Sequence, residues 1–202
     1  MTTFVDIHAL QTLPPSNINR DDTGSPKSAF FGGVQRQRVS SQAWKSVIRR
    51  DFESHLDRSQ LGVRTRLVAD KVVARILELA PEFDAEKAET AVVAAFKAAG
   101  ITLKEPKAKE GEEAGRPVSG YLLLLSNQQI DKLVQAIIEA NGEKLPAKQV
   151  KEILDTNHSV DIALFGRMLA DAPDFNVDAA CPAAHALSVH GSEPVSYTHL
   201  TL

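Results

Sequence analysis

Five basic side chains and no acidic one occupy the stretch FFGGVQRQRVSSQAWKSVIRR at positions 30–50. The whole chain has a formal net charge of -3, whereas residues 1–50 alone carry seven Lys or Arg against three Asp or Glu. Positive charge is therefore concentrated in the first quarter of a mildly acidic chain. Such a local excess is typical of an anion-binding surface, although a solvated helix face can have the same composition.

The spacing of these residues brings their side chains together. Arg36 and Arg38 are two positions apart and would share one face of a strand. Lys45 and Arg49 are four positions apart and would be neighbours on a helix. Between them, Ser40, Ser41 and Gln42 stand where a helix is expected to begin, and free backbone N–H groups at a helix start attract phosphate. Few aromatic residues lie nearby, so the pattern predicts a site that holds a sugar–phosphate backbone rather than one that reads bases.

Hydrophobic periodicity predicts an α+β chain in which helices are inserted between strands. We expect an apolar stripe on the first helix to lie in the core, with Trp44 as its anchor. YLLLLS at 121–126 is either a buried strand or the lead-in to a helix, and 104–120 is a charged loop. The expected strands are 3–10, 34–39, 159–170 and 183–190. Five helices are expected: one that starts at Ser40 or Ser41, one over about 66–80, one from 84 to 100, one after the capping box SNQQ at 126–129, and one near 147–154.

Residues that could support catalysis or metal binding form no convincing group. Cys181, His185 and His190 have a C-x3-H-x4-H spacing, but three ligands without a second cysteine pair are weak evidence for zinc. The adjacent acids Asp21 and Asp22 could bind a hard cation, yet such pairs are more often solvated or paired with a neighbour such as Arg20. Phosphate-binding loops, dinucleotide fingerprints and hydrolase motifs are absent from the sequence. We therefore expect no metal and no cofactor.

The bulk composition predicts a soluble cytoplasmic protein. The apolar run in YLLLLS is far too short to cross a membrane, and MTTFVDIHAL lacks the features of a signal peptide. A single cysteine excludes an internal disulfide framework and fits a reducing compartment.

Three blocks of residues resemble the CasC family, the backbone subunits of the type I-E Cascade complex of CRISPR interference. They are NINRDD at 17–22, FGGVQRQRVSSQAWKSVIR at 31–49 and VDIALFGRM at 160–168. AAHALSVH at 183–190 resembles the segment that follows in that family. The blocks occur in the family order and at family-like spacing.

The resemblance implies an RNA-recognition-motif-like (ferredoxin-like) palm formed by residues 1–50 and 156–195, with a helical insertion at 51–155. It also implies a subunit without nuclease activity that polymerises along a CRISPR RNA and presents the guide to target DNA. The implied partners are the CRISPR RNA, target DNA through the guide, further copies of the chain and other Cascade subunits.

The residues at positions that match the family's RNA contacts are those that the resemblance implies as RNA-binding. Arg20 and Lys27 would lie by the RNA backbone, and Ser40, Gln42, Lys45 and Arg49 would grip phosphates. Arg167 and Met168 would lie where family members pack against a nucleotide. Spacing alone adds three further candidates, Arg36, Arg38 and Ser41.

The resemblance ends after HGSEPV, because the final residues SYTHLTL at 196–202 match nothing expected of the family. We interpret this segment as a non-native tail. We accordingly expect the C-terminal part of the palm and the RNA-wedging thumb to be missing.

Two other functions remain alternatives at the level of sequence. RNA-processing endoribonucleases of CRISPR systems share the expected fold, but they need a placed acid–base set. His8 is the only early candidate here, and a lone histidine on a strand is more often structural. A DNA-binding regulator would need a recognition helix, for which no pattern is evident.

Overall fold

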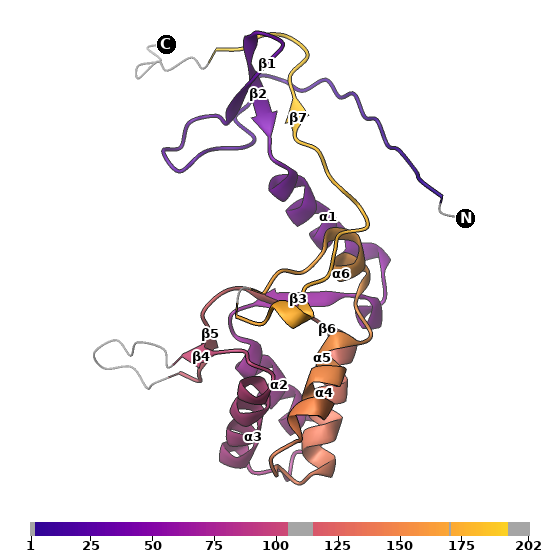
Figure 1. The fold of residues 1–202 in the computed structure, drawn as a ribbon. Helices are drawn as coiled ribbons and strands as arrows, with labels where there is room; N and C mark the ends of the chain where they lie inside the picture. The colour runs from indigo at the N-terminus through magenta and orange to yellow at the C-terminus, as the bar shows by residue number, and fades with distance from the viewer. Residues whose placement is uncertain (1–2, 105–114, 170, 194–202) are drawn as a thin grey trace. The chain divides into compact units, whose positions relative to one another are not determined.

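The computed structural model describes residues 3–104, 115–169 and 171–193, which form two compact units. The first unit comprises residues 1–47 and 183–202, and the second comprises residues 48–182. Helix α1 (Ser41–His55) begins in the first unit and ends in the second (Figure 1).

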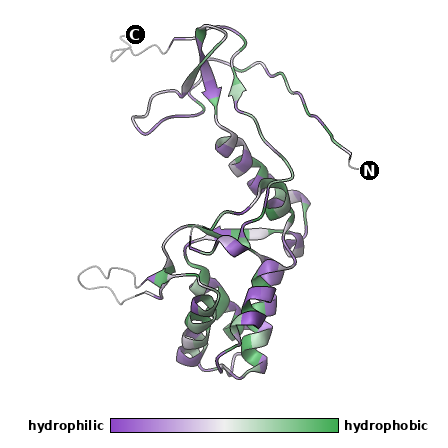
Figure 2. Cartoon of the chain, viewed as in Figure 1, coloured by the Kyte–Doolittle hydropathy of each residue, from purple (hydrophilic) through white to green (hydrophobic). Residues whose placement is uncertain are grey.

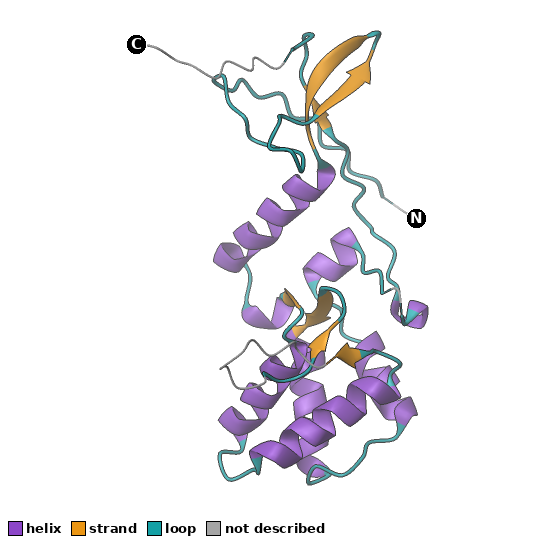
Figure 3. Ribbon diagram, turned by 90° about the vertical axis from the view of Figure 1, so that its left-hand side faces the viewer, coloured by secondary structure: helices purple, strands orange, loops and turns teal. Residues whose placement is uncertain are grey.

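The first unit contains a three-stranded antiparallel sheet with the order β1-β2-β7. Strands β1 (Ser28–Phe31) and β2 (Val34–Val39) form a hairpin, drawn as orange arrows in Figure 3. Phe31 pairs with Val34 next to the turn. The two residues between them, Gly32 and Gly33, have φ of +63° and +79°. Two consecutive positive φ values define the turn that suits a twisted hairpin, and glycine adopts them without strain. The strand predicted at 34–39 is confirmed, whereas only Ala186–Leu187 of the segment 183–190 forms a strand, β7.

Helix α1 begins where the sequence predicts it, but its apolar stripe is not buried as expected. Ser40 Oγ accepts a hydrogen bond from the Ala43 backbone N–H at 3.2 Å, which caps the helix. Trp44 is 38% exposed and Val47 is 51% exposed, and no residue of α1 is fully buried. The prediction that Trp44 anchors the helix in a core is therefore wrong, because its side chain remains partly exposed.

The second unit combines helices with two small antiparallel sheets, β3 with β6 and β4 with β5. Its strands are β3 (Gly62–Thr65), β4 (Leu103–Lys104), β5 (Val118–Ser119) and β6 (Leu123–Ser126). Besides the end of α1, its helices are α2 (Val68–Leu79), α3 (Ala85–Ala98), α4 (Asn127–Glu139), α5 (Ala147–Asp155) and α6 (Val160–Phe165), with short 3₁₀ helices at Arg58–Gln60 and Pro173–Phe175.

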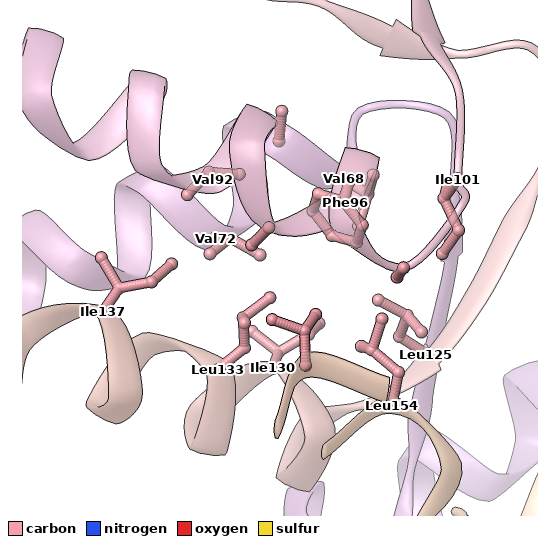
Figure 4. Packing of buried hydrophobic residues seen from close by; sticks show 14 of the residues in the cluster. Val68, Val72, Val92, Phe96, Ile101, Leu125, Ile130, Leu133, Ile137 and Leu154 are labelled. Carbon is pink, nitrogen blue, oxygen red and sulfur yellow. The ribbon is translucent and has the colours of Figure 1, made fainter. Parts of the chain in front are cut away.

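One hydrophobic cluster holds the second unit together. Helices α2, α3 and α4 each carry apolar and polar residues, seen in Figure 2 as green and purple, and turn their apolar residues toward this cluster. Figure 4 shows facing side chains of these helices meeting those of β6 and α5. The stripes predicted for α2 and α4 are confirmed by burial of Val68, Val72, Ile76, Ile130, Leu133, Val134 and Ile137, with Leu77 and Ile138 partly buried.

The predicted helix boundaries of this unit depend on identifiable side chains. Asp84 Oδ1 accepts from the Lys87 N–H at 2.7 Å and caps α3, and Gly100, with φ of +84°, follows its end. Ser126 and Gln129 form the predicted capping box of α4 through two reciprocal hydrogen bonds of 3.0 Å. Within the run at 121–126, Leu123–Ser126 form a buried strand, β6, whose last residue caps the next helix.

Two strands predicted from alternating residues are absent from the structure. Residues 3–10 form no strand, and Phe4, Val5 and Ile7 are at least 80% exposed. A strand needs a partner for its backbone groups, and no described strand pairs with this segment. Within the segment predicted as the strand 159–170, Val160–Phe165 instead form helix α6, because Ile162 and Phe165 are buried three residues apart, which is a helical spacing.

The mixture of helices with small antiparallel sheets agrees with the α+β class, while the recognition-motif-like palm stays a prediction. Residues 156–182, assigned to that palm from the sequence, belong here to the same unit as the helices. Residues 105–114 of the expected loop and the tail at 196–202 lie outside the described residues. Within the described ranges, no helix combines the length and apolar content that a membrane crossing requires.

Gln129 offers a direct test of this core. Its side chain is fully buried, caps α4 and donates to the carbonyls of Leu154 at 2.9 Å and Thr156 at 2.8 Å. Replacing it by alanine should lower the free energy of unfolding by about 3 kcal/mol, because the cap is removed and the carbonyls of Leu154 and Thr156 each lose one donor. The exposed neighbour Gln128 is the matched control, and Gln128→Ala should change the unfolding midpoint in urea much less. Equal effects of the two substitutions would contradict this assignment.

Candidate nucleic-acid interface

The loop that precedes β1 is ordered by the Asp21 side chain. Asp21 Oδ1 accepts hydrogen bonds from the Thr23 hydroxyl at 2.7 Å and from the N–H groups of Thr23 and Ser25 at 2.9 and 3.0 Å. The hydrogen bond from Thr23 is the main reason that the pKa of Asp21 lies below its usual value. Arg20 pairs with Pro26 in a β-bridge and remains exposed. The acid that the sequence offers as a cation ligand thus organises the loop.

Lys27 and Arg38 are brought together beside this loop. They line a pocket of about 340 Å³ with Asp21, Asp22, Pro26 and Ser28. The Arg38 Nε–H is buried and makes no hydrogen bond within the described part of the chain. Because a buried donor without an acceptor is unfavourable, an anionic oxygen at Arg38 would be stabilising. The two basic side chains are the candidate anion contacts of this pocket, which the carboxylates of Asp21 and Asp22 also line.

Arg36, in contrast, is used within the fold. Its Nε donates to the Phe31 carbonyl at 3.0 Å, and its Nη1 donates to the carbonyls of Ser188, at 2.9 Å, and Val189. The guanidinium also lies over the Phe31 ring, 5.9 Å from its centroid. Arg36 and Arg38 occupy one face of β2 as predicted, but Arg36 joins the hairpin to the segment after β7.

The backbone N–H groups at the start of α1 are largely occupied. Ser40 N–H donates to Asn19 Oδ1 at 2.9 Å, and Ser41 N–H donates to His185 Nδ1 at 3.0 Å. The Ala43 N–H is taken by the Ser40 cap. The expectation that free N–H groups here receive phosphate is therefore wrong for these three. Side-chain groups remain as the candidate contacts of this helix start.

Three predicted contacts on α1 differ in their surroundings. Gln42 is exposed, and its Oε1 accepts weakly from the Ser41 hydroxyl at 3.4 Å. Lys45 is partly exposed and lies in the first unit. Arg49 lies in the second unit, where its Nε is 3.7 Å from Asp161 Oδ2 and its guanidinium is 5.1 Å from the Phe165 ring centroid. Burial is the main reason that the Arg49 pKa is lowered.

Arg167 and Met168 have opposite environments in the second unit. Arg167 is 4% exposed and donates to the carbonyls of Phe175 and Leu154, whereas Met168 is 81% exposed. The sequence predicts both as neighbours of a nucleotide, but only Met168 is accessible.

Sequence reasoning missed two residues that position the start of α1, Asn19 and His185. Asn19 lies in the block NINRDD and His185 in AAHALSVH, so both were visible as parts of recognised blocks but not as hydrogen-bond acceptors. Among the residues that the structure describes, no three His, Cys, Asp or Glu side chains gather as a metal site.

Comparison with known proteins identifies the family. A family model described as CT1975-like protein, a CRISPR-associated family, matches residues 5–196. The chain belongs to this family. The recognition made from the three sequence blocks is thereby confirmed at the level of the family.

Solved structures similar to this CT1975-like chain come from CRISPR complexes. One chain of a "CRISPR RNA-guided surveillance complex" is 37% identical over 90% of this chain, with a TM-score of 0.71. A chain of a "CRISPR RNA-guided surveillance complex, pre-nicking" is 36% identical over 87% of this chain, with a TM-score of 0.68. This chain spans 57% and 50% of them, about half their length. No curated protein matches.

His158, beside the buried Arg167, predicts a pH dependence of stability. Its Nε2 is buried, 4.0 Å from Asp155 Oδ1, and has no hydrogen-bond partner among the described residues; its pKa is lowered by burial and by the Arg167 charge. The unfolded chain therefore binds a proton more readily than the folded one, so stability is lost as the pH falls below about 6.5. The free energy of unfolding, measured by urea titration, should fall less steeply below that pH in His158→Gln than in the wild type. Identical pH profiles would exclude His158 as a source of the dependence.

Proposed function

We propose that this chain is a CRISPR-RNA-binding backbone subunit of a type I-E Cascade surveillance complex, acting in the cytoplasm in antiviral defence. Copies of it would polymerise along the guide and hold its sugar–phosphate backbone for pairing with target DNA. Other Cascade subunits and the CRISPR RNA would be its partners.

One observation carries the proposal. Over 90% of its length the chain is 37% identical to a subunit of a solved CRISPR RNA-guided surveillance complex, at a TM-score of 0.71. Identity at this level over most of the chain makes a related role the simplest explanation. Membership of the CT1975-like family supports the same role.

The geometry of the first unit supports backbone contacts rather than base reading. Lys27 and Arg38 line one pocket, and the Arg38 Nε–H lacks an acceptor within the described residues. Lys45 follows on α1. Cationic side chains of this kind contact phosphate without distinguishing sequences, as a scaffold for variable guides requires.

Salt-dependent RNA binding tests the proposal. Lys27→Ala combined with Lys45→Ala should weaken binding of unstructured RNA oligonucleotides of unrelated sequence to the same extent. The slope of log K against log salt concentration should become less negative by about 0.7 for each phosphate that the variant no longer neutralises. Fluorescence anisotropy at several salt concentrations measures both quantities.

Lys148 on α5 is the matched control, because it is an exposed lysine of the second unit. Lys148→Ala should leave affinity and slope unchanged. Loss of binding to one RNA sequence alone, or an equal effect of Lys148→Ala, would contradict backbone recognition by Lys27 and Lys45.

We further propose that the subunit is a scaffold without nuclease activity. His8 is exposed in the segment 3–10, which has no regular secondary structure, so no observation favours it as a catalytic base. CRISPR repeat RNA incubated with the wild type and with His8→Ala should remain intact in both samples on a denaturing gel. Cleavage by the wild type that disappears in His8→Ala would establish the endoribonuclease alternative instead.

A further inference from the structure

The sheet formed by β3 and β6 has two different faces. Val63 and Leu125 pair with each other across the two strands and pack at the hydrophobic cluster. Arg64 and Leu124 form the next pair along the same strands, so their side chains lie on the opposite face. Helix α6 packs against both strands (Figure 1). Arg64 is therefore placed on the face that the hydrophobic cluster does not use.

Asp161 of α6 lies on the Arg64 face of this sheet. A Cβ on Gly62 would lie 3.0 Å from Asp161 Oδ1 and 2.8 Å from Ser159 Oγ. Because Gly62 and Arg64 are two positions apart on β3, their side-chain directions point to the same face. Asp161 is 3% exposed, and its Oδ1 accepts a hydrogen bond from the Ser159 hydroxyl at 2.5 Å. A buried carboxylate thus stands beside the strand that carries Arg64.

Arg49, on the part of α1 that belongs to the second unit, is held at this carboxylate. Its Nε is 3.7 Å from Asp161 Oδ2, and its guanidinium lies over the Phe165 ring, 5.1 Å from the ring centroid. The Phe165 ring is itself stacked with Phe52, with the two centroids 6.2 Å apart. The ring therefore contacts one face of the guanidinium while the carboxylate lies at its Nε side.

The donors of Arg49 are not used up by these contacts. Its Nε–H is buried and makes no hydrogen bond within the described part of the chain, and its two Nη groups have no acceptor there either. A desolvated guanidinium without acceptors is unfavourable, so an oxygen ligand that reaches the Nη groups would be stabilising.

Positive charge also exceeds negative charge in this group. Arg64 is exposed, and none of the described Asp or Glu side chains forms an ion pair with it. Burial is the main reason that the pKa of Arg49 is lowered, Asp161 raises that pKa, and the charge of Arg64 lowers it, as expected for neighbouring guanidinium groups. One carboxylate thus serves two guanidinium groups, and a bound anion would offset their repulsion.

A phosphate group fits these two guanidinium groups well. The planar fork of arginine donates two parallel N–H···O bonds to phosphate or carboxylate oxygens. A phosphodiester has two charged oxygens and can therefore accept from both side chains at once.

We propose that Arg64 is a phosphate-binding residue that shares one phosphate group of bound RNA with Arg49, and that Asp161 and Phe165 hold the Arg49 guanidinium in place for it. Arg64 lies outside the sequence blocks that resemble the family, whereas Arg49 and Asp161 lie inside them. The choice of RNA as the source of the phosphate rests on the proposed function. Binding of the anion itself can be measured without RNA.

The first test uses inorganic phosphate as the probe. In the ¹⁵N-labelled chain, the Nε–H signals of Arg49, Arg64 and the exposed Arg58 are assigned by replacing each residue in turn with lysine. Exchange of chloride for phosphate at constant ionic strength should shift the Arg49 and Arg64 signals with one common dissociation constant and leave the Arg58 signal in place. Equal shifts of all three signals, or no shift of the first two, would overturn the proposal. A larger response to acetate than to phosphate would indicate a carboxylate ligand and would also overturn it.

The second test measures affinity for an unstructured RNA oligonucleotide. Arg64→Lys keeps the positive charge but loses the fork, so it should weaken binding about three- to tenfold with an almost unchanged salt slope. Arg58→Lys is the matched control and should bind as the wild type does. Because a diffuse positive field would not distinguish arginine from lysine, wild-type affinity of Arg64→Lys would overturn the proposal.

The sharing of one phosphate predicts the salt dependence of a double variant. Arg49→Gln with Arg64→Gln should make the slope of log K against log salt concentration less negative by about 0.7 in total, because one phosphate is no longer neutralised. A change of about 1.4 would mean two separate phosphates and would contradict sharing.

Arg64→Gln alone keeps the proposal testable if the replacement of Arg49 prevents folding. Because Arg64 is exposed, this variant should have the wild-type unfolding midpoint in urea. It should bind RNA more weakly, and the Arg49 signal should respond less to inorganic phosphate. A wild-type phosphate response of Arg49 in Arg64→Gln would overturn the proposal.

The two proposals fail differently. If Lys27→Ala with Lys45→Ala binds RNA as the wild type does, backbone recognition at these residues fails, but the phosphate titration still tests Arg49 and Arg64. If that double variant weakens binding while Arg64→Lys does not, the proposed function stands and the inference is overturned.

Discussion

The need to satisfy buried polar groups at Gln129 controls the organisation of the second unit. The Gln129 side chain accepts a hydrogen bond from the Ser126 N–H and donates to the two carbonyls at the end of α5. It also lies within weak hydrogen-bonding distance of the Arg167 guanidinium. Each of these groups would be costly to bury alone. The end of β6, the helices α4 and α5 and the segment before Met168 must therefore be placed together, and the hydrophobic cluster then packs around this arrangement.

The same principle limits which basic residues can hold a ligand. Arg36 and Arg167 are equal candidates with Lys27 and Arg38 when judged by charge, but their guanidinium groups donate to carbonyls of the chain itself. Three N–H groups at the start of α1 are likewise bonded to side chains. Some basic side chains thus hold the fold together, and others remain as candidate ligand contacts. The hydrogen-bond partners of a basic side chain show which role it has better than its position in the sequence does.

Elements whose signals are local could be predicted from the sequence, and those that depend on distant partners could not. The capping box at 126–129 and the Gly32–Gly33 turn involve residues a few positions apart, so their chemistry is visible in the sequence. The segment 3–10 alternates like a strand, but a strand exists only with a partner. The apolar residues of the segment 159–170 fit both the period of two of a strand and the spacing of three of a helix. The burial of Phe165 together with Ile162 favours the helix. For the candidate site, the blocks of residues were sufficient to suggest the family. They did not show that Arg167 is buried whereas the neighbouring Met168 is exposed.

The hydrogen bond between Ser41 N–H and His185 Nδ1 joins residues 144 positions apart, and β2 pairs with β7 over a similar distance. During synthesis, the hairpin and the first turn of α1 leave the ribosome long before His185 is made. The second unit, whose residues lie between these partners in the sequence, can fold in that interval, since domains generally fold as units as they emerge. The three-stranded sheet and the start of α1 can be completed only after that, when the returning chain delivers β7 and the His185 acceptor.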